Sequence, residues 1–193
     1  QCEQFKLTRV VAGMLEDFPD ASIRYDCRVT EVSQNGDGVT VRVDTPGGIE
    51  ETMSDYLIGC DGSRSVVRKS IDMEFEGFTY PEQFVIASVS EPIDEIVPDM
   101  GHVAYISHPK EWCALIHAPD FWRFMYPIPV DMTQEEAFED EFLQQRLKRL
   151  VPYEGHYSTN HLSIYAVNQR VAKCYRRGRV LLAGDSAHVN NPL

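Results

Sequence analysis

Several features that would place the chain in other protein classes are missing from its sequence. No apolar run approaches the roughly 20 residues that a membrane-spanning helix needs. Basic residues are scarce, since 18 Lys and Arg stand against 30 Asp and Glu, a net charge of −12. Nucleic acids and anionic membrane surfaces repel a chain of this charge, so neither is an expected partner.

Cysteine and histidine are too scattered for a disulfide framework or a metal site. The 5 cysteines contain no Cys-x-x-Cys pair, and an odd, dispersed set is typical of reduced, mostly buried side chains in a cytoplasmic protein. His156 and His161 have no cysteine or carboxylate at helical spacing, so zinc is not expected. Gly184-Asp185-Ser186 does not have the Gly-x-Ser-x-Gly pattern of a hydrolase elbow.

The most informative stretch is the C-terminal segment, Gly178–Leu193. Its apolar run Val180–Ala183 is typical of a strand buried inside a covered sheet. The run ends in Gly184-Asp185, where glycine permits a turn and a close ligand, and open α/β sheets bind ligands just past the carboxyl ends of their strands. A carboxylate accepts hydrogen bonds but repels phosphate, so a ribose or ribityl chain is the expected partner of Asp185.

A second strand with a polar end lies earlier in the chain. Residues 55–60 form another apolar strand pattern, and the polar segment Asp61–Arg68 follows it. Asp61 and Gly62 predict a turn into a helix, because Ser63 and Ser65 are both good helix caps. Read on its own, this segment is a structural turn with an ion-paired Arg68.

The two motifs together resemble those of the flavin-dependent aromatic hydroxylases, the para-hydroxybenzoate hydroxylase-like monooxygenases. Gly178-Arg-Val-Leu-Leu-Ala-Gly-Asp-Ser-Ala-His188 is similar to the second FAD motif of that family, with Ser186 where the family has alanine. Asp61–Arg68 resembles its Asp-Gly motif, preceded by Cys60 where alanine is usual.

The resemblance implies a set of cofactor contacts. Gly184 and Asp185 would bind the ribityl side of FAD, and Pro192 would lie beside the isoalloxazine ring. Asp61 and Gly62 would help to bind the pyrophosphate and, indirectly, the nicotinamide donor. We identify no catalytic base among the side chains, and His188 fits a helix residue better than a base.

Two earlier positions are implied by the same resemblance, and both have a simpler interpretation. Gln4 matches a position where Gln or Arg reaches FAD from the end of a helix, although a solvated glutamine fits as well. Val29, in the segment Cys27–Thr30, would touch the adenine through its main chain, whereas the residue alone fits a core valine equally well.

Hydrophobic periodicity predicts the elements that carry these motifs. Residues 3–18 should form a helix with one core face, and Pro19 ends it. Residues 22–54 should form an antiparallel meander, with a hairpin turn at Asn35–Gly38. Further strands are expected at 84–89, 102–107, 112–118, 121–128 and 157–170. Thr133-x-x-Glu136 is a capping box that opens a helix running to Val151, whose basic residues lie on a solvated face.

Aromatic side chains are concentrated in the strands between the two motifs. They could line an apolar ligand cavity, but for any single one of them an ordinary core position is favoured. The residues are Tyr105, Trp112, Phe121, Trp122, Phe124 and Tyr126.

We therefore expect an α/β fold with an α+β substrate part: a portion of a Rossmann-like FAD-binding domain with an inserted mixed β-sheet substrate domain. The predicted division is 1–71 and 174–193 for the FAD-binding domain and 72–173 for the substrate-binding sheet. No Gly-x-Gly-x-x-Gly turn opens the chain, and its first glycine is Gly13. Since that turn cradles the ADP pyrophosphate in the family, we expect an internal segment of a longer flavoprotein.

The resemblance implies an FAD-dependent monooxygenase that hydroxylates an electron-rich aromatic ring with NADPH or NADH and O2. The expected partner is a small aromatic substrate, the expected location is cytoplasmic, and a homodimer is left open. The alternatives are another flavoprotein of the wider group (a halogenase, reductase or epoxidase) and a flavin-binding module that is inactive alone.

Overall fold

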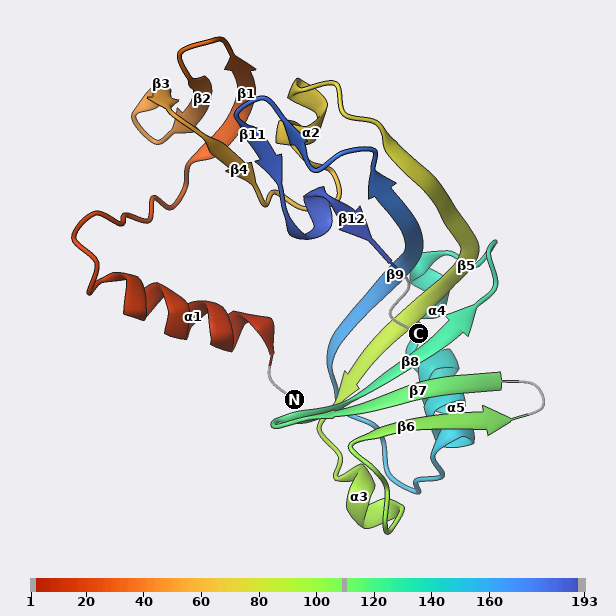
Figure 1. Cartoon of the computed structure of the whole chain (residues 1–193). Helices are drawn as coiled ribbons and strands as arrows, with labels where there is room; N and C mark the ends of the chain where they lie inside the picture. The colour runs from red at the N-terminus through yellow and green to blue at the C-terminus, as the bar shows by residue number, and fades with distance from the viewer. Residues whose placement is uncertain (1–2, 109–110, 191–193) are drawn as a thin grey trace. The chain divides into compact units, whose positions relative to one another are not determined.

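The computed structural model describes residues 3–108 and 111–190, which cluster into two compact units (Figure 1). Unit 1 contains residues 1–18 and 80–167, and unit 2 contains residues 19–79 and 168–193. Two long strands, β5 (Phe75–Val89) and β9 (Thr159–Ala172), run from one unit into the other. Both units combine helices with strands, which confirms the mixed α/β class. The predicted domain division at residues 71 and 173 stays a prediction.

Unit 2 contains the predicted antiparallel meander, made of β1 (Arg28–Gln34), β2 (Val39–Thr45) and β3 (Gly48–Ser54). The Asn35 side chain closes the hairpin turn, because its Oδ1 accepts hydrogen bonds from the backbone N–H groups of Asp37 (2.9 Å) and Gly38 (3.0 Å). The first strand begins at Arg28 rather than near residue 22. Asp26 has a left-handed backbone (φ 53°), which interrupts the expected extended run.

The second sheet of unit 2 joins the two motif strands. β4 (Leu57–Gly59) and β11 (Val180–Leu182) pair in parallel, and β10 (Arg176–Arg177) pairs antiparallel with β11. The buried side chains of Val180 and Leu182 belong to a core that also contains the valines of the meander. The predicted buried strand before Gly184 is therefore confirmed.

The segments after these two strands are short. β4 leads to the helix α2 (Val66–Ser70), and β11 leads to a single 3-10 turn, η1 (Gly184–Ser186). We expected a helix after the Gly-Asp pair, and this was wrong for the described residues. The backbone N–H of Ala172 donates to the Ala187 carbonyl (2.7 Å), and β12 (His188–Val189) pairs with β9, so the chain is drawn into a strand.

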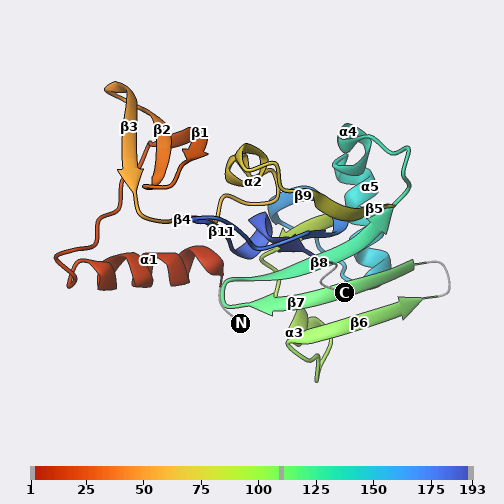
Figure 2. The same ribbon diagram turned by 45° about the horizontal axis from the view of Figure 1, so that its top comes forward.

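Unit 1 is built on an antiparallel sheet in which β5 pairs with β8 (Phe121–Ile128), β8 with β7 (Glu111–Ala118) and β7 with β6 (Val103–His108). Figure 2 shows β8, β7 and β6 side by side. One face of the sheet, here called the core face, packs against α3 (Ile93–Ile96), α4 (Gln134–Ala137) and α5 (Asp140–Leu150). The strands predicted in this region are confirmed, with β5 longer than expected and β9 shifted by two residues along the chain.

The helix predicted from Thr133 to Val151 is instead two helices. The capping box of Thr133 and Glu136 is present and opens α4. Glu139 is extended (ψ 127°) and separates α4 from α5. Ala137 and Leu143 are both fully buried, yet six residues apart on one continuous helix they would point about 120° apart. The break at Glu139 lets both side chains reach the same core.

The last turn of α5 is not simply a solvated face, as we had expected. Glu111 of β7 is buried, and Arg146 and Arg149 of α5 both form ion pairs with its carboxylate. Burying a carboxylate is costly unless it is paired, so these two arginines tie α5 to the first residue of β7.

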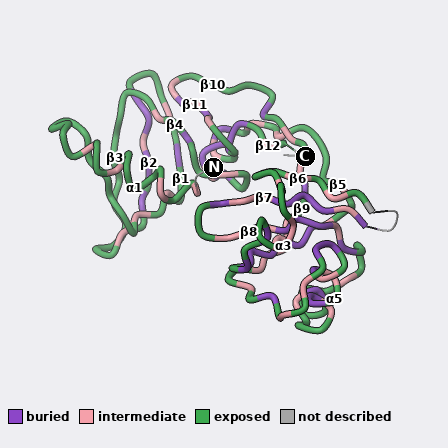
Figure 3. Tube along the Cα trace, turned by 90° about the horizontal axis from the view of Figure 1, so that it is seen from below, coloured by how far each residue is buried: buried purple, intermediate pink, exposed green. Residues whose placement is uncertain are grey.

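The apolar face of α1 (Gln4–Leu15) is exposed, so the prediction of a core face was wrong for this chain. None of its residues is buried, and most are coloured as exposed in Figure 3. Within unit 1 the helix is held by a polar contact, since Lys6 Nζ donates to Asp120 Oδ2 (2.6 Å). Pattern alone cannot tell whether an apolar stripe has a partner in the same chain.

Two further findings concern composition. Of the four cysteines in the described part of the chain, only Cys113 is buried, while Cys60 and Cys174 are exposed. The expectation of mostly buried cysteines was therefore wrong. Among the described helices, none has the length and apolar composition needed to cross a membrane.

Leu147 and Leu7 test this packing with the same substitution. Leu147 on α5 is 0% exposed and Leu7 on α1 is 59% exposed. Leu147→Ala should lower the free energy of unfolding by about 2–5 kcal/mol because it leaves a cavity. Leu7→Ala should change it by no more than about 0.5 kcal/mol. Urea denaturation followed by circular dichroism measures both, and equal losses would show that the apolar face of α1 is buried in solution.

Candidate functional site

Two polar loops leave the parallel strands of unit 2 at the same edge. Leu57 pairs with Val180 and Gly59 with Leu182, so the carboxyl ends of β4 and β11 are adjacent. One residue further, the backbone N–H of Ala183 donates to the Gly59 carbonyl (3.0 Å). The Asp61-Gly62 loop and the Gly184-Asp185 loop therefore begin side by side, in the position where parallel α/β sheets bind ligands.

The carboxylate of Asp61 points back into its own chain. Its oxygens accept hydrogen bonds from the hydroxyl of Ser65 (2.5 Å) and from the backbone N–H groups of Val66 (2.7 Å) and Val67 (3.1 Å). These N–H groups belong to the first turn of α2, where the helix itself offers no acceptor. Asp61 therefore caps α2, together with Ser65, whose hydroxyl accepts from the N–H of Arg68 (2.8 Å).

These contacts also set the ionisation of Asp61. Partial burial alone would raise its pKa, but the hydrogen bonds from Ser65, Val67 and Val66 outweigh burial and hold the pKa of Asp61 below its ordinary 3.8. Asp61 is thus a carboxylate at neutral pH whose acceptor capacity is largely used inside the loop.

Arg68 is the side chain that connects the two loops. It is 4% exposed, and its guanidinium donates from Nη1 to the Ser186 carbonyl (2.8 Å) and from Nη2 to the Ser63 carbonyl (2.6 Å). The guanidinium also lies over the ring of Phe75, 3.8 Å from its centroid. Its partners are carbonyl groups rather than a carboxylate, so the ion pair of the purely structural interpretation is absent among the described residues.

Burial lowers the pKa of Arg68 from its ordinary value, and the charge of Asp61 opposes the shift. Arginine remains protonated in proteins, so the two carbonyl contacts are charge-assisted. We had not predicted this role. The available signal was an arginine directly after the apolar pair Val66-Val67.

Ser186, the one departure from the family's second motif, has a structural role. Its hydroxyl lies within donating distance of the Gly59 carbonyl (2.5 Å) and the Ala183 carbonyl (2.8 Å), and it accepts from the N–H of Ala183 (3.2 Å). The side chain is fully buried. Alanine could make none of these contacts, so serine adds a link between the ends of β4 and β11.

Asp185 differs from Asp61 in that its side chain is directed outward. It is exposed, and the structure records no hydrogen bond or ion pair for its carboxylate among the described residues. Gly184 before it has φ 61°, and Gly62 in the other loop has φ 77°. A Cβ would meet nothing within 4 Å at either glycine, so backbone conformation rather than space requires glycine there.

The remaining predicted site residues are not all part of this arrangement. Val29 lies on β1 in unit 2, next to a β-bulge at Thr30 that interrupts the ladder with β2. Gln4 is the exposed first residue of α1, in unit 1. Pro192 lies outside the described residues. The cofactor roles given to all of these residues stay predictions.

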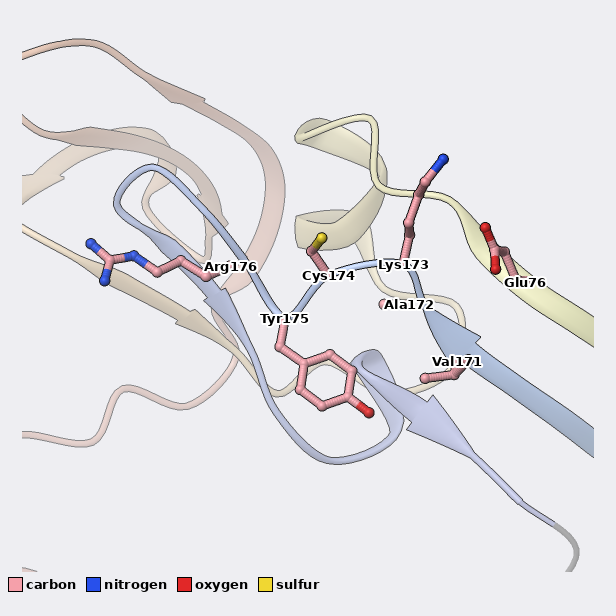
Figure 4. Close-up of a pocket in the computed structure, with 7 residues that line it drawn as sticks. All are labelled: Glu76, Val171, Ala172, Lys173, Cys174, Tyr175 and Arg176. Atoms are coloured by element: carbon pink, nitrogen blue, oxygen red, sulfur yellow. The ribbon is translucent and has the colours of Figure 1, made fainter.

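A surface cavity of about 700 Å3 lies in unit 2 beside the strand that precedes β11. Figure 4 shows its lining: Glu76, Val171, Ala172, Lys173, Cys174, Tyr175 and Arg176. The ring of Tyr175 is 6.2 Å from that of His188, two residues after η1, so the cavity adjoins the Gly-Asp loop. Lys173 forms an ion pair with Glu74 (3.3 Å).

Within the described residues no group of His, Cys, Asp and Glu is placed to hold a metal ion.

The sequence matches the family described as "FAD binding domain" over residues 1–193. The chain belongs to that family. It is 33% identical to para-nitrophenol 4-monooxygenase of Pseudomonas sp. (strain WBC-3), over 98% of this chain and 47% of that protein. It is 32% identical to the 3-(3-hydroxy-phenyl)propionate/3-hydroxycinnamic acid hydroxylase of Mycobacterium sp. (strain JLS), over 91% of this chain and 30% of that protein.

A solved structure agrees with these relatives. The p-nitrophenol 4-monooxygenase PnpA from Pseudomonas putida DLL-E4 superposes with a TM-score of 0.92 at 31% identity, over 99% of this chain and 49% of that one. The resemblance to flavin-dependent aromatic hydroxylases is therefore confirmed. The chain spans less than half the length of the relatives it matches.

The residues at the strand ends fit FAD. The exposed carboxylate of Asp185, which has no recorded partner among the described residues, is a suitable acceptor for ribityl hydroxyl groups, as the sequence predicted. Asp61 fits a different role, since its oxygens already accept three hydrogen bonds. It would support FAD binding by shaping the loop around Gly62.

Exchange of each aspartate for alanine should separate these roles. Asp185→Ala should leave the free energy of unfolding without FAD nearly unchanged. It should weaken FAD binding about tenfold to a hundredfold, because one hydrogen bond to a charged group is lost. Asp61→Ala should cost about 0.5–2 kcal/mol of stability, because a helix cap is lost. Urea denaturation and FAD titration measure the two effects. An unchanged FAD affinity in Asp185→Ala would remove Asp185 from the site.

Alanine substitutions of Arg68 and of the nearby Arg64 test whether Arg68 links the two loops. Arg68→Ala should lower stability by about 2–4 kcal/mol, because the buried Ser186 carbonyl and the partly buried Ser63 carbonyl lose a charged donor. Arg68→Lys should recover only part of this, since an ammonium group lacks the planar fork that spans both carbonyls. Arg64→Ala, at an exposed position, should cost no more than about 0.5 kcal/mol. If both alanine variants unfold at the same urea concentration, Arg68 does not hold the loops.

Proposed function

We propose that the protein is an FAD-dependent monooxygenase that hydroxylates an electron-rich, phenolic aromatic substrate with NADPH or NADH and O2. The observation that carries the proposal is the pair of adjacent loops after β4 and β11, with the outward carboxylate of Asp185. The names of the relatives support the reaction class, since both are hydroxylating enzymes of aromatic compounds.

The alternation of side chains in the sheet of unit 1 supports the substrate class. Trp122, Phe124 and Tyr126 are buried in the core cluster with the helices. The opposite face of the sheet is here called the second face. Strand pairing and the alternation of side chains place Tyr105, Trp112 and Phe121 on it. The six aromatic residues thus divide equally between core and second face, and we propose the second face as the surface that holds the aromatic ring.

When bound, FAD supplies the redox chemistry by which NAD(P)H, O2 and a proton convert the ring C–H to C–OH, with NAD(P)+ and water as the other products. The residues of this chain bind and position. Asp185 accepts hydrogen bonds from the ribityl chain, while Asp61 and Arg68 fix the two loops that would approach the cofactor. The apolar side chains of the second face bind the ring and exclude water from it.

Several further expectations belong to the same proposal. Gly62, Gly184, Val29, Gln4 and Pro192 are proposed cofactor contacts. The division into a FAD-binding part and a substrate sheet, a cytoplasmic location and a homodimer are proposed as well.

Stoichiometry tests the proposed reaction directly. Phenols and hydroxybenzoates should raise the rate of NAD(P)H oxidation at least about tenfold, equivalent to about 1.4 kcal/mol of activation free energy. Mass spectrometry should show a product heavier by one oxygen atom, and 18O2 should supply that atom.

Other outcomes would assign the protein differently. Product formation that requires halide indicates a halogenase. NAD(P)H oxidation that yields a reduced substrate without added oxygen indicates a reductase. Retention of FAD with no NAD(P)H oxidation in the presence of any aromatic compound indicates a binding module, and the monooxygenase proposal fails.

A further inference from the structure

Strand β6 is an edge of the unit 1 sheet. It pairs with β7 on one side, and on its other side the described residues provide no strand (Figure 2). The ladder with β7 runs from Val103 to His108 without a register shift. The strand contains no Asp, Glu, Lys or Arg and no proline. Edge strands usually carry such residues, or a bulge, which prevent them from pairing with another chain.

The other edge strands of the described sheets have these protective features. β1 contains Arg28, Glu31 and a bulge at Thr30. β3 contains Glu50 and Glu51. β4, β10 and β12 are only two or three residues long. Among the described edges β6 is therefore the exception, because it is a regular strand of six residues without a protecting charge.

The outward hydrogen-bonding groups of β6 belong to every second residue. The N–H of His117 donates to the carbonyl of His102 directly opposite (2.8 Å). Bonded and non-bonded pairs alternate along an antiparallel ladder. The backbone N–H and C=O groups of Val103, Tyr105 and Ser107 therefore point away from β7. No hydrogen bond of these groups is recorded among the described residues.

The side chains at the same positions are exposed and uncharged. By alternation they lie on the second face of the sheet, where Val103 is 48% and Tyr105 is 65% exposed. The chain has a net charge of −12, so an acidic surface would repel the same surface of another copy. This edge carries no such charge. Its backbone groups and apolar side chains fit a second strand of the same kind.

We propose that β6 pairs antiparallel with β6 of a second copy of this chain. The proposal assigns a surface to the homodimer proposed above and does not depend on the reaction. A two-fold register centred on Tyr105 uses all the outward residues, because Tyr105 lies opposite its own copy and Val103 lies opposite Ser107. The two sheets then form one sheet, and the two Tyr105 rings are neighbours on a continuous second face.

Opposite charges at position 105 test the interface and its register together. Analytical ultracentrifugation should show that wild type changes from one chain to two as its concentration rises. Tyr105→Lys and Tyr105→Glu should each weaken dimerisation at least about tenfold, because like charges meet at the two-fold axis. An equimolar mixture of the two variants should recover dimers, since lysine then lies opposite glutamate.

Two further variants separate association from folding. Met53→Lys places the same charge at a 71% exposed position of β3, the edge strand of unit 2, and should leave dimerisation unchanged. Ser107→Pro removes an outward N–H that β7 does not use, so it should weaken dimerisation and keep the β6–β7 ladder. Circular dichroism should be the same for all variants, and dimers in the lysine–glutamate mixture would show that both of its members are folded.

Amide hydrogen exchange followed by NMR reports on the same edge residue by residue. The amides of Val103, Tyr105 and Ser107 should exchange slowly in the dimer and fast after dilution to the monomer. The amides of Ala104 and Ile106 bond to β7, so they should exchange slowly in both states.

The outcomes also separate this proposal from the proposed reaction. Wild type that stays monomeric at every concentration overturns the interface, and so do Tyr105→Lys and Tyr105→Glu variants that each dimerise as well as wild type. Slow exchange of the Tyr105 amide in a monomer would overturn it too, because residues of the same chain would then cover the edge. A monomer that hydroxylates phenols would leave the reaction standing. A dimer that oxidises no NAD(P)H would leave the interface standing.

Discussion

The buried guanidinium of Arg68 is the contact on which the candidate site depends. It donates to carbonyls on both sides of the parallel strand pair, one in the Asp61 loop and one in η1. Without Arg68 the buried carbonyl of Ser186 would lose its charged donor, at a cost of about 1–3 kcal/mol. Ser186 adds a shorter link between Gly59 and Ala183. Together they hold two loops that lie more than 100 residues apart in sequence.

This arrangement gives different roles to two aspartates that look alike in the sequence. Each follows a strand of the parallel pair, and each adjoins a glycine with positive φ. Asp61 uses its oxygens to cap α2, whereas Asp185 presents a carboxylate for which residues 3–108 and 111–190 provide no recorded partner. Which aspartate is available to a ligand depends on the direction of the following backbone. The helix after Asp61 supplies N–H donors that the single turn after Asp185 does not.

Local sequence signals were sufficient to predict much of the fold. The Asn35–Gly38 turn, the apolar strand before Gly184 and the Thr133–Glu136 capping box each involve residues within a few positions of one another. The adjacency of the two motifs was also predictable, through the family resemblance. Contacts between distant residues were not. The pairing of Arg146 and Arg149 with Glu111, the break at Glu139 and the exposure of α1 all depend on which surfaces meet in three dimensions. The role of Arg68 was missed for the same reason.

A crystal structure of the protein with FAD tests the division between the two aspartates most directly. The account predicts that a carboxylate oxygen of Asp185 lies within about 3 Å of a ribityl hydroxyl. It also predicts that Asp61 still accepts from Val66 and Val67, and that Arg68 still bridges Ser63 and Ser186. A structure in which Asp61 turns to the cofactor and releases α2, while Asp185 stays in solvent, would contradict it.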